Sequence, residues 1–480
     1  MAFLIGGANS AADTGYDVAN SCRFDSASSD TLTQTQSTAT SDKIGTFSVW
    51  MKASSTAATR AVFSGQEDSN NRIALYFSDT LRIYGAVGGS QTVYLITNQL
   101  FRDFSAWYHV VIAWDTTQGT AANRMKVYVN GSQITSWSTE TYPTEDSDIY
   151  WNKGSNLDIG ARRISSVQDY YDGYLAETVF IDGLQLAPTS FGEFDEDSPI
   201  IWKPIDVSGL TFGNNGFYLD FEDSGDLGDD ESGNTNDFTE TNIGATNQAT
   251  DTPTNNFATF NSLTSSRQSG GVVAYSEGNV NIVTSYTDAN YLRYPQAYST
   301  LGATAGKWYA EFKPTAMGSA AVGIANTGEF GSDGSTNPYA GYAASGAVYT
   351  NGGEYRANDG SSGGQGTYTT NDIIGVAMDL DNLKLYWHKN GTYINSGDPE
   401  SAATGTGARA IVAPATPGGF YVFTAGSDNT NVATISGNFG NPSYANSSSV
   451  SDANGYGDFE YAVPSGYLAL CTKNLGSDGG

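Results

Sequence analysis

The chain of 480 residues contains only two cysteines, Cys22 and Cys471, which lie near opposite ends of the sequence. So small a number excludes a disulfide framework and a cysteine-ligated metal site, and we expect both thiols to be reduced. No stretch is apolar for the ~18 residues that a membrane-spanning helix needs, and the start, MAFLIGGANS, lacks the basic region of a secretory signal. We therefore expect neither membrane insertion nor a signal peptide.

Basic residues are also scarce. Asp and Glu outnumber Lys and Arg by 51 to 22, which gives a formal charge of −29. A field of that sign repels phosphate backbones, so nucleic acid is a poor partner.

Charged residues make up only 15% of the chain, whereas Gly and Tyr number 56 and 30. This composition favours strands and turns over long helices, and the 22 Phe and 8 Trp are ample for packed cores. The sequence predicts an all-β fold.

The length predicts two or three domains, because single cores stop growing beyond about 250 to 300 residues. Strand-length apolar runs between turn clusters recur over residues 20–199 and again over 270–445, the pattern of a β-sandwich or jelly roll. Each block contains an Asn-Gly pair, Asn130–Gly131 or Asn390–Gly391, that predicts a tight hairpin. We expect the two sandwiches to be accompanied by an N-terminal attachment segment (1–19), a polar, turn-rich connector with an acidic turn (200–269), and a C-terminal docking tail (446–480).

Candidate catalytic groups are few. A glycoside hydrolase on a β-sandwich needs two carboxylates, and the segment nearest to the pattern E-x-D-x-x-E is EFDEDS, 193–198. Ser198 stands in place of the second Glu, and a hydroxyl cannot replace the carboxylic acid that protonates a leaving group. The two histidines, His109 and His388, lie in strand patterns among aromatic residues, which predicts partly buried structural side chains, and no G-x-S-x-G elbow or phosphate-binding glycine loop occurs. We predict that the protein is not an enzyme.

The acidic segment DFEDSGDLGDDESGNTNDFT, 220–239, is the natural place to seek a calcium site. Counted from Asp229 as position one of an EF-hand loop, Gly233 and Asn234 occupy positions five and six, so a ligand and the turn glycine are both misplaced. Two interpretations are left: a polar turn held by Asx side-chain to backbone bonds, or a looser structural Ca²⁺ site. The ligands of the second would be Asp229, Asn234, Asn236 and Asp237.

Two loops of the first block combine aromatic rings with amide and carboxylate groups. Exposed rings on loops stack on the apolar face of a sugar, while polar neighbours bond its hydroxyls. The candidate carbohydrate-binding residues are Tyr150, Trp151 and Asn152 in DIYWNKGSN, 148–156, and Tyr170 and Tyr171 in SSVQDYYDG, 165–173. The alternative is that these rings pack back onto the core.

Several segments of the first block occur in a distinctive order: FSVWMKA, WYHVVIAWD, MKVYVNG, LDIGAR and YDGYLAETVFIDGLQLAP. With them the block resembles the laminin-G-like branch of the concanavalin-A-like lectin/glucanase superfamily. The resemblance implies a two-sheet jelly roll whose loop rim binds glycans or proteins, sometimes through Ca²⁺, although Ala176 stands where related domains often have an acidic residue. The second block, with GKWYAEF, AVGIAN, DIIGVAMDLDNLKLYWHKNG and ISGNFGNP, is similar to a SPRY domain, a related sandwich used for recognition.

The terminal and linking segments are similar to modular structural proteins of tailed phages, especially marine ones; they include MAFLIGGANSAADTGYDVANSCRF, LAPTSFGEFDED, TPTNNFATFN and PSGYLALCTKNL. This resemblance implies assembly in the host cytoplasm, a place on the virion surface among other virion proteins, and a homo-oligomer such as a trimer. We therefore expect a non-enzymatic fibre, spike or tail-associated adhesin that binds host cell-surface polysaccharide. A purely architectural capsid or tail decoration protein is the alternative, and a polysaccharide depolymerase is less favoured.

Overall fold

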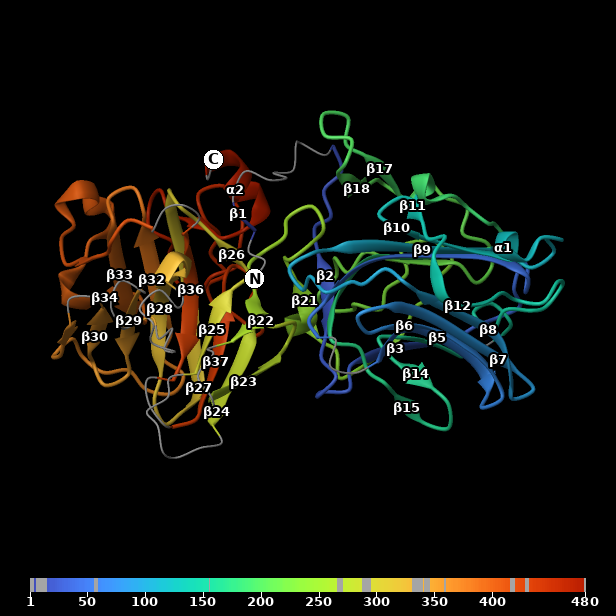
Figure 1. Cartoon of the computed structure of the whole chain (residues 1–480), viewed down its shortest axis with the longest axis horizontal. Coiled ribbons are helices and arrows are strands. Elements are labelled where there is room, and N and C mark those ends of the chain that lie inside the picture. Colours follow the sequence, from blue (N-terminus) through green and yellow to red (C-terminus); the bar gives the residue numbers. More distant parts are fainter. Residues whose placement is uncertain are drawn as a thin grey trace. The chain divides into compact units, whose positions relative to one another are not determined.

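The computed structural model describes residues 4–5, 15–55, 59–154, 156–265, 271–286, 295–329, 340, 346–357, 360–414, 419–427 and 431–478. Strands account for 45% of the chain and helices for 6%, which confirms the predicted all-β class. The chain divides into two compact units, the first formed by residues 12–254 and the second by residues 1–11 and 255–480 (Figure 1). Among the described residues, no helix is long and apolar enough to cross a membrane.

The described part of the first unit contains two sheets of eight strands. In order, sheet one consists of β11 (Ser132–Gln133), β10 (Met125–Val129), β9 (Tyr108–Asp115), β4 (Ile44–Ala53), β16 (Gly173–Asp182), β2 (Ser21–Phe24) and β21 (Gln248–Ala249), with β19 (Phe217–Leu219) also on β16. Sheet two consists of β12 (Trp137–Thr141), β8 (Ser90–Thr97), β7 (Leu81–Val87), β6 (Asn71–Phe77), β5 (Arg60–Asp68), β13 (Asn156–Ile159), β3 (Thr31–Thr35) and β20 (Thr239–Thr241).

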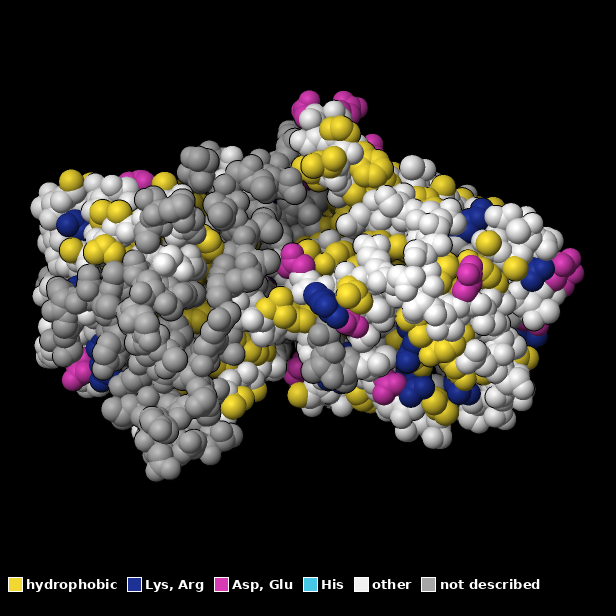
Figure 2. Space-filling view, in the orientation of Figure 1, with side chains coloured by type: hydrophobic (Ala, Val, Ile, Leu, Met, Phe, Trp, Pro, Cys, Tyr) yellow, Lys and Arg dark blue, Asp and Glu magenta, His cyan; other side chains and the backbone are white. Residues whose placement is uncertain are grey.

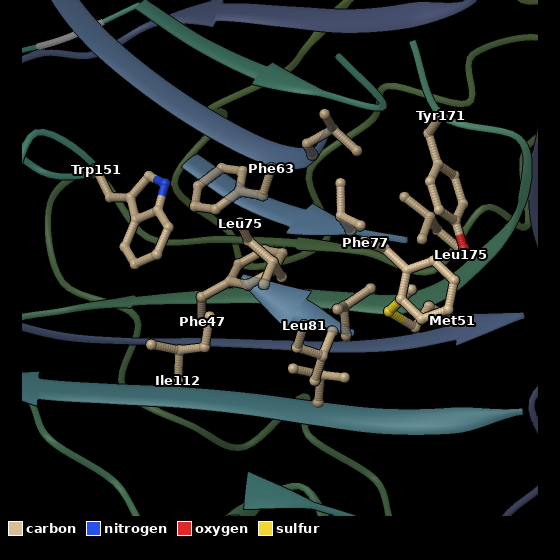
Figure 3. Close-up of a cluster of buried hydrophobic side chains, with 14 of the residues drawn as sticks. Phe47, Met51, Phe63, Leu75, Phe77, Leu81, Ile112, Trp151, Tyr171 and Leu175 are labelled. Atoms are coloured by element: carbon tan, nitrogen blue, oxygen red, sulfur yellow. The ribbon is translucent and has the colours of Figure 1, made fainter. Parts of the chain in front are cut away.

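The core of the first unit lies between these two sheets, as a sandwich requires. Alternate residues of each strand point inward, so Phe47 of β4 and Phe63 of β5 meet with ring centroids 4.1 Å apart. Figure 3 shows these rings among other buried side chains from both sheets, including Leu75 and Ile112. The strand period of two therefore places one set of residues in the core and leaves the other set on the outer face of each sheet.

The two predicted Asn-Gly hairpins are both present. Asn130 and Gly131 have φ of 47° and 75° between β10 and β11, and Asn390 and Gly391 have φ of 49° and 79° between β33 (Lys384–Lys389) and β34 (Thr392–Tyr393). Positive φ at both central residues is what the type I′ turn requires. In each unit the Asn side chain also accepts a hydrogen bond from a neighbouring strand, 2.8 Å from the backbone N–H of His109 or Ile373.

The outer face of sheet one is covered by the chain that follows β16. Its apolar residues include Trp50 and Val179, which pack in clusters with Trp202, Val207 and Phe212. Residues 200–254, expected to be part of a connector, instead belong to the first unit, in which β19, β20 and β21 pair with β16, β3 and β2. The physical reason is that the sparse apolar side chains of this segment bury an otherwise exposed apolar face.

The described part of the second unit also has two sheets. One consists of β22 (Phe260–Ser265), β25 (Gln296–Ser299), β36 (Tyr421–Gly426), β28 (Ala321–Asn326), β29 (Gly346–Thr350), β30 (Tyr355–Ala357) and β31 (Gly360–Ser362). The other consists of β23 (Gly271–Ser276), β24 (Asn281–Tyr286), β37 (Ala433–Asn438), β27 (Lys307–Met317), β32 (Ile374–Asp379), β33 and β34, with β35 (Arg409–Ala410) on β33 and β38 (Leu468–Ala469) on β27. β1 (Leu4–Ile5) pairs with β26 (Leu301–Gly302).

Short elements complete the two units. Two hairpins lie outside the sandwich sheets of the first unit: β14 (Arg162–Arg163) with β15 (Val167–Gln168), and β17 (Gly192–Phe194) with β18 (Trp202–Pro204). Within the described ranges the helices are α1 (Ala121–Arg124), α2 (Thr472–Asp478), and the 3₁₀ turns Pro188–Ser190, Ala245–Asn247, Thr327–Glu329, Ile394–Ser396 and Pro399–Thr404.

The chain after β37 lies on the second unit. Glu311 of β27 is buried, and its carboxylate accepts hydrogen bonds of 2.9 Å from the backbone N–H groups of Glu460 and Tyr461. Aromatic residues of this segment, such as Phe459 and Tyr467, pack against residues of the sheet. Of the predicted tail, 446–480, residues 446–478 are described; its buried residues pack against the sandwich, and its backbone donates hydrogen bonds to Glu311.

Candidate functional site

The first predicted sugar-binding loop turns its rings inward. Trp151 has no exposed surface, and its ring centroid lies 5.6 Å from that of Phe63 and 5.4 Å from that of Trp114. Figure 3 shows the Trp151 indole between the sheets. Tyr150 is buried in the same core. The expectation of exposed stacking rings is therefore wrong for both residues, because they fill the space between the sheets.

Asn152 is buried as well, and its amide is already engaged. Its Nδ2 donates to the carbonyl of Ser41 at 2.8 Å and to the carboxylate of Asp182 at 2.5 Å, and its Oδ1 accepts from Asn215 at 3.3 Å. The carboxylate of Asp182 also accepts from the backbone N–H of Thr40 at 2.7 Å. A buried polar network of this kind fixes the surrounding loops, so the role of Asn152 is structural.

The second predicted loop is divided between core and surface. Tyr171 is buried, and its ring packs edge-on to Phe24 at 6.4 Å, so it is not available to a sugar. Tyr170 is partly exposed, and its hydroxyl donates to the carbonyl of Val167 at 3.4 Å. Of the five candidate residues, only Tyr170 keeps an accessible ring.

The four candidate calcium ligands lie in a turn that is organised by hydrogen bonds. The Nδ2 groups of Asn234 and Asn236 donate to the carbonyl of Gly216 at 2.9 and 2.8 Å, and Asp237 accepts from the N–H of Asp230 at 3.2 Å. The pKa of Asp229 is raised, first by burial and then by neighbouring carboxylates. These are the bonds of the polar-turn interpretation. Within the described ranges no three His, Cys, Asp or Glu side chains are grouped so that they could hold a metal ion.

Both histidines are buried and structural, as predicted. The Nδ1 of His109 accepts from the indole of Trp202 at 2.8 Å, and its Nε2 lies 2.8 Å from the Oγ of Ser48. Nε2 of His388 lies 2.6 Å from the hydroxyl of Tyr309. Burial lowers the pKa of His109 to about 3 and that of His388 to about 4, so both rings are neutral at physiological pH.

A different group of residues occupies the outer face of sheet two. On β6, Ile73, Leu75 and Phe77 face the core, so Arg72, Ala74 and Tyr76 share the outer face. The register places Tyr76 opposite Arg82 of β7, and Tyr84 of β7 opposite Tyr94 of β8. We define the arginine–tyrosine face as Arg72, Tyr76, Arg82, Tyr84, Tyr94 and Arg162, the last from the β14–β15 hairpin.

The arginines of this face stack on its tyrosines. The guanidinium carbon of Arg82 lies 4.3 Å from the centroid of the Tyr76 ring, and that of Arg162 lies 5.5 Å from the same ring. The guanidinium of Arg72 lies 5.7 Å from the ring of Tyr84. Such cation–π contacts hold flexible arginine side chains near one position and so preorganise their N–H donors.

The charges of the arginine–tyrosine face are only partly neutralised. Arg162 forms an ion pair of 2.7 Å with Asp169, and Arg72 donates to the carbonyl of Ser69. Arg82 forms no ion pair with any described residue. Figure 2 shows dark blue Lys and Arg side chains beside yellow ones over the area where β14 and β15 are drawn in Figure 1. The face therefore offers positive charge next to partly exposed tyrosine rings.

The β14–β15 hairpin borders this face on one side. Gln66 of β5 donates from Nε2 to the carbonyl of Ile164 at 3.2 Å, which fastens the hairpin over β5. The face was not predicted from the sequence, although a signal for it was present. In RIALYFSDTLRIYGAV, residues 72–87, Arg and Tyr recur at even spacing in both strands and so fall on one face.

Comparison with known proteins supports the fold of the first unit. Residues 25–184 match the family model described as the concanavalin A-like lectin/glucanases superfamily. These residues form a concanavalin A-like domain. No curated protein matches the chain.

Several solved structures resemble parts of the chain. A pentraxin from Limulus polyphemus has 20% identity and a TM-score of 0.28, over 36% of this chain and 80% of that one. The SPRY domain of human HERC1 has 11% identity and a TM-score of 0.26, over 37% of this chain and 96% of that one. A putative carbohydrate binding protein from Bacteroides ovatus has 15% identity and a TM-score of 0.31, over 47% of this chain and 59% of that one.

Next to Ala176, the concanavalin A-like domain has a buried carboxyl group, that of Glu177. Glu177 has φ of 46° at a break in register between β16 and β4, and its side chain is buried. Its carboxyl group accepts hydrogen bonds from the hydroxyls of Tyr218 at 3.0 Å and Tyr16 at 3.1 Å. Burial is the main reason that its pKa is raised to about 8. The pair of tyrosines makes Glu177 a structural group of the domain.

Proposed function

We propose that the protein is a non-enzymatic carbohydrate-binding protein of the virion surface, namely a fibre, spike or tail-associated adhesin that attaches to host cell-surface polysaccharide. The concanavalin A-like domain supports binding of carbohydrate in general. The virion role is supported by the resemblance of the terminal and linking segments to tailed-phage proteins. Structural Ca²⁺ in the 229–237 turn and a trimeric state are further parts of this proposal.

The observation that carries the proposal is the arginine–tyrosine face of sheet two, in which Tyr76 is buried but Tyr84 and Tyr94 keep accessible surface. Tyr84 and Tyr94 lie edge to face at 5.8 Å, and both are partly exposed. Rings of this kind accept the apolar face of a sugar, while Arg N–H groups donate to its oxygens. The opposite side of the sandwich offers no such surface in its described part, because residues 186–254 pack over the apolar residues there.

Substitution of the rings tests this site. We expect Tyr84→Ala and Tyr94→Ala each to weaken adsorption to bacterial cells and binding on a glycan array by roughly fivefold, given the ~1 kcal/mol that an aromatic contact contributes. Tyr128→Ala on sheet one is the matched control, and Tyr170→Ala tests the remaining rim residue. If the purified protein adsorbs to neither cells nor polysaccharide, or if only Tyr170→Ala weakens binding, the proposed site is wrong.

An architectural role is the second candidate function, and it rests on the β17–β18 hairpin. Phe194 and Ile200 are 45% and 87% exposed, and Asp195 accepts from the N–H of Ser198 at 2.9 Å in the acidic turn between them. Figure 2 shows yellow side chains beside magenta ones at this hairpin. A protruding apolar residue suits contact with another virion protein. Failure of Ile200→Asp to enter particles, with glycan binding intact, would favour this role.

A polysaccharide depolymerase is the least favoured alternative. Asp195 lies in a turn with Ser198, where a hydrolase of this fold would need a second carboxylate. Release of reducing ends from host polysaccharide by the purified protein would establish it.

A further inference from the structure

Carboxylates neutralise most of the basic residues of the first unit. Among its described residues, ion pairs are formed by Lys43, Lys52, Arg60, Arg102, Arg124, Lys153, Arg162, Arg163 and Lys203. Arg72 and Arg82 form none with described residues, although acidic residues outnumber basic ones by 51 to 22 in the chain. Both lie on the arginine–tyrosine face, where their Nε atoms are shielded and have no hydrogen-bond acceptor among the described residues.

The two unpaired arginines are spaced along the strands. Arg82 lies opposite Tyr76 and Arg72 opposite Ala86, so they are four residues apart in register. At ~3.3 Å per residue, the backbone positions of the two arginines are about 13 Å apart along the strands. Tyr84 stands between them in register, opposite Ala74. The surface therefore alternates positive charge, an aromatic ring and positive charge.

We propose that the arginine–tyrosine face binds polysaccharides that carry carboxylate groups, with Arg82 pairing with the carboxylate of one sugar and Tyr84 contacting the ring of another. This inference rests on the proposed carbohydrate-binding function and specifies its ligand class. A guanidinium presents a planar pair of N–H donors that matches a carboxylate, and the bond is charge-assisted. Uronate and sialate residues both supply that group.

A charged polysaccharide fits this face better than nucleic acid does. Duplex DNA carries a charge every ~1.7 Å, and a chain with net charge −29 repels so dense a polyanion beyond the small basic area. A polysaccharide with one charge for each sugar or pair of sugars has charges that are farther apart than those of DNA, so single carboxylates can pair with single arginines. Screening within about 8 Å at physiological salt also limits the repulsion from distant carboxylates.

The test compares acidic polysaccharides with their neutral counterparts. Binding of the full-length protein is measured on immobilised polygalacturonate, alginate and polysialic acid, each also in carboxyl-reduced form, and on duplex DNA at the same salt concentration. We expect wild-type protein to prefer at least one acidic polymer to its reduced form by about tenfold or more, because charge-assisted hydrogen bonds are stronger than neutral ones.

Substitutions test whether the preference for the acidic polymer depends on the arginine–tyrosine face. Arg82→Gln is expected to lose about tenfold on the acidic polymer only, and Arg82→Lys, which keeps the charge without the planar donors, to fall between. Lys126→Gln removes one charge from the outer face of sheet one and is expected to bind within about twofold of wild type. Unchanged unfolding midpoints show that the variants are folded.

Three outcomes would overturn the inference in distinguishable ways. Equal binding of acidic and reduced polymers refutes the carboxylate requirement but leaves the carbohydrate-binding function intact. Equal binding of DNA and acidic polysaccharide, or equal losses in Arg82→Gln and Lys126→Gln, shows a general polyanion effect. Binding to no polysaccharide on the glycan array refutes the proposed function together with this inference.

Discussion

Replacing Glu177 by glutamine is expected to remove a loss of stability that the first unit undergoes as pH rises through neutrality. The pKa of Glu177 is raised from 4.5 to about 8, mainly by burial and further by Asp220 and Glu222, while the hydrogen bonds from Tyr218 and Tyr16 act in the opposite direction. The folded unit therefore binds a proton at pH 6 that the unfolded chain has already released. Ionisation above pH 8 leaves a buried carboxylate.

The sign and size of the effect follow from proton linkage. Because the folded state binds the extra proton, stability is fully present below pH 4.5 and falls as pH rises to about 8. The difference of about 3.5 between the two pKa values corresponds to an upper limit of about 5 kcal/mol, at 1.36 kcal/mol per pH unit. We expect the measured loss of unfolding free energy to be at least about 2 kcal/mol and to stay below that limit, because local rearrangement around the ionised carboxylate reduces it. The substituted side chain would sit on a backbone with the same positive φ, so backbone strain cancels in the comparison.

His109 gives the same unit an opposite dependence at lower pH. Its pKa is depressed from 6.5 to about 3, so its contribution is present above pH 6.5 and is lost as pH falls toward 3. Because the two opposite dependences cancel between pH 4.5 and 6.5, urea unfolding followed by tryptophan fluorescence from pH 5 to 9 should show a constant stability for wild type up to about pH 6.5 and a decline from there to about pH 8. Glu177→Gln should remove this decline and should instead show a stability that rises from pH 5 to 6.5 and is level above it, whereas Glu140→Gln, on β12, should behave as wild type. A Glu177→Gln profile parallel to wild type would refute the reasoning.

Three further substitutions are expected to change the unfolding free energy of the first unit in chemical denaturation. Asp251→Asn removes the carboxylate charge that lies 2.6 Å from the buried ammonium of Lys52 and should cost about 3–5 kcal/mol; a cost below about 1 kcal/mol would contradict the burial. Tyr171→Phe removes a buried hydroxyl that has no hydrogen-bond partner among the described residues and should be neutral or stabilising, whereas clear destabilisation would reveal a partner. Gly131→Ala places a Cβ 2.4 Å from the Trp202 ring at a φ of 75° and should destabilise by about 1–3 kcal/mol, unlike Gly119→Ala in open space.

The features that were predictable from sequence are those that local geometry determines. The Asn-Gly turns at 130–131 and 390–391 need positive φ at two adjacent residues, and few other pairs adopt it so readily. The strands have a period of two, so segments such as FSVWMKA assign alternate residues to a core without knowledge of their partners. The burial of His109 and His388 followed from their position within such strands.

The features that were missed depend on contacts between distant segments. Whether the Trp151 ring turns outward or inward is decided by the space that Phe63 and Trp114 leave between two sheets, and no local pattern contains that information. Residues 200–254 have strands of only two or three residues, so their periodicity is too short to detect. Their pairing with β2, β3 and β16 joins residues far apart in the sequence.

The position of the candidate site follows from how the two outer faces of the first sandwich differ. Sheet one carries Trp50, Val179 and Ile181 on its outer side, an apolar surface that water disfavours, and the chain after β16 covers it. Sheet two carries Arg72, Arg82 and partly exposed tyrosines on its outer side, and these side chains are stable in contact with water. The same alternation that builds the core thus leaves one outer face to be packed by protein and the other free to meet a polar, ring-shaped ligand.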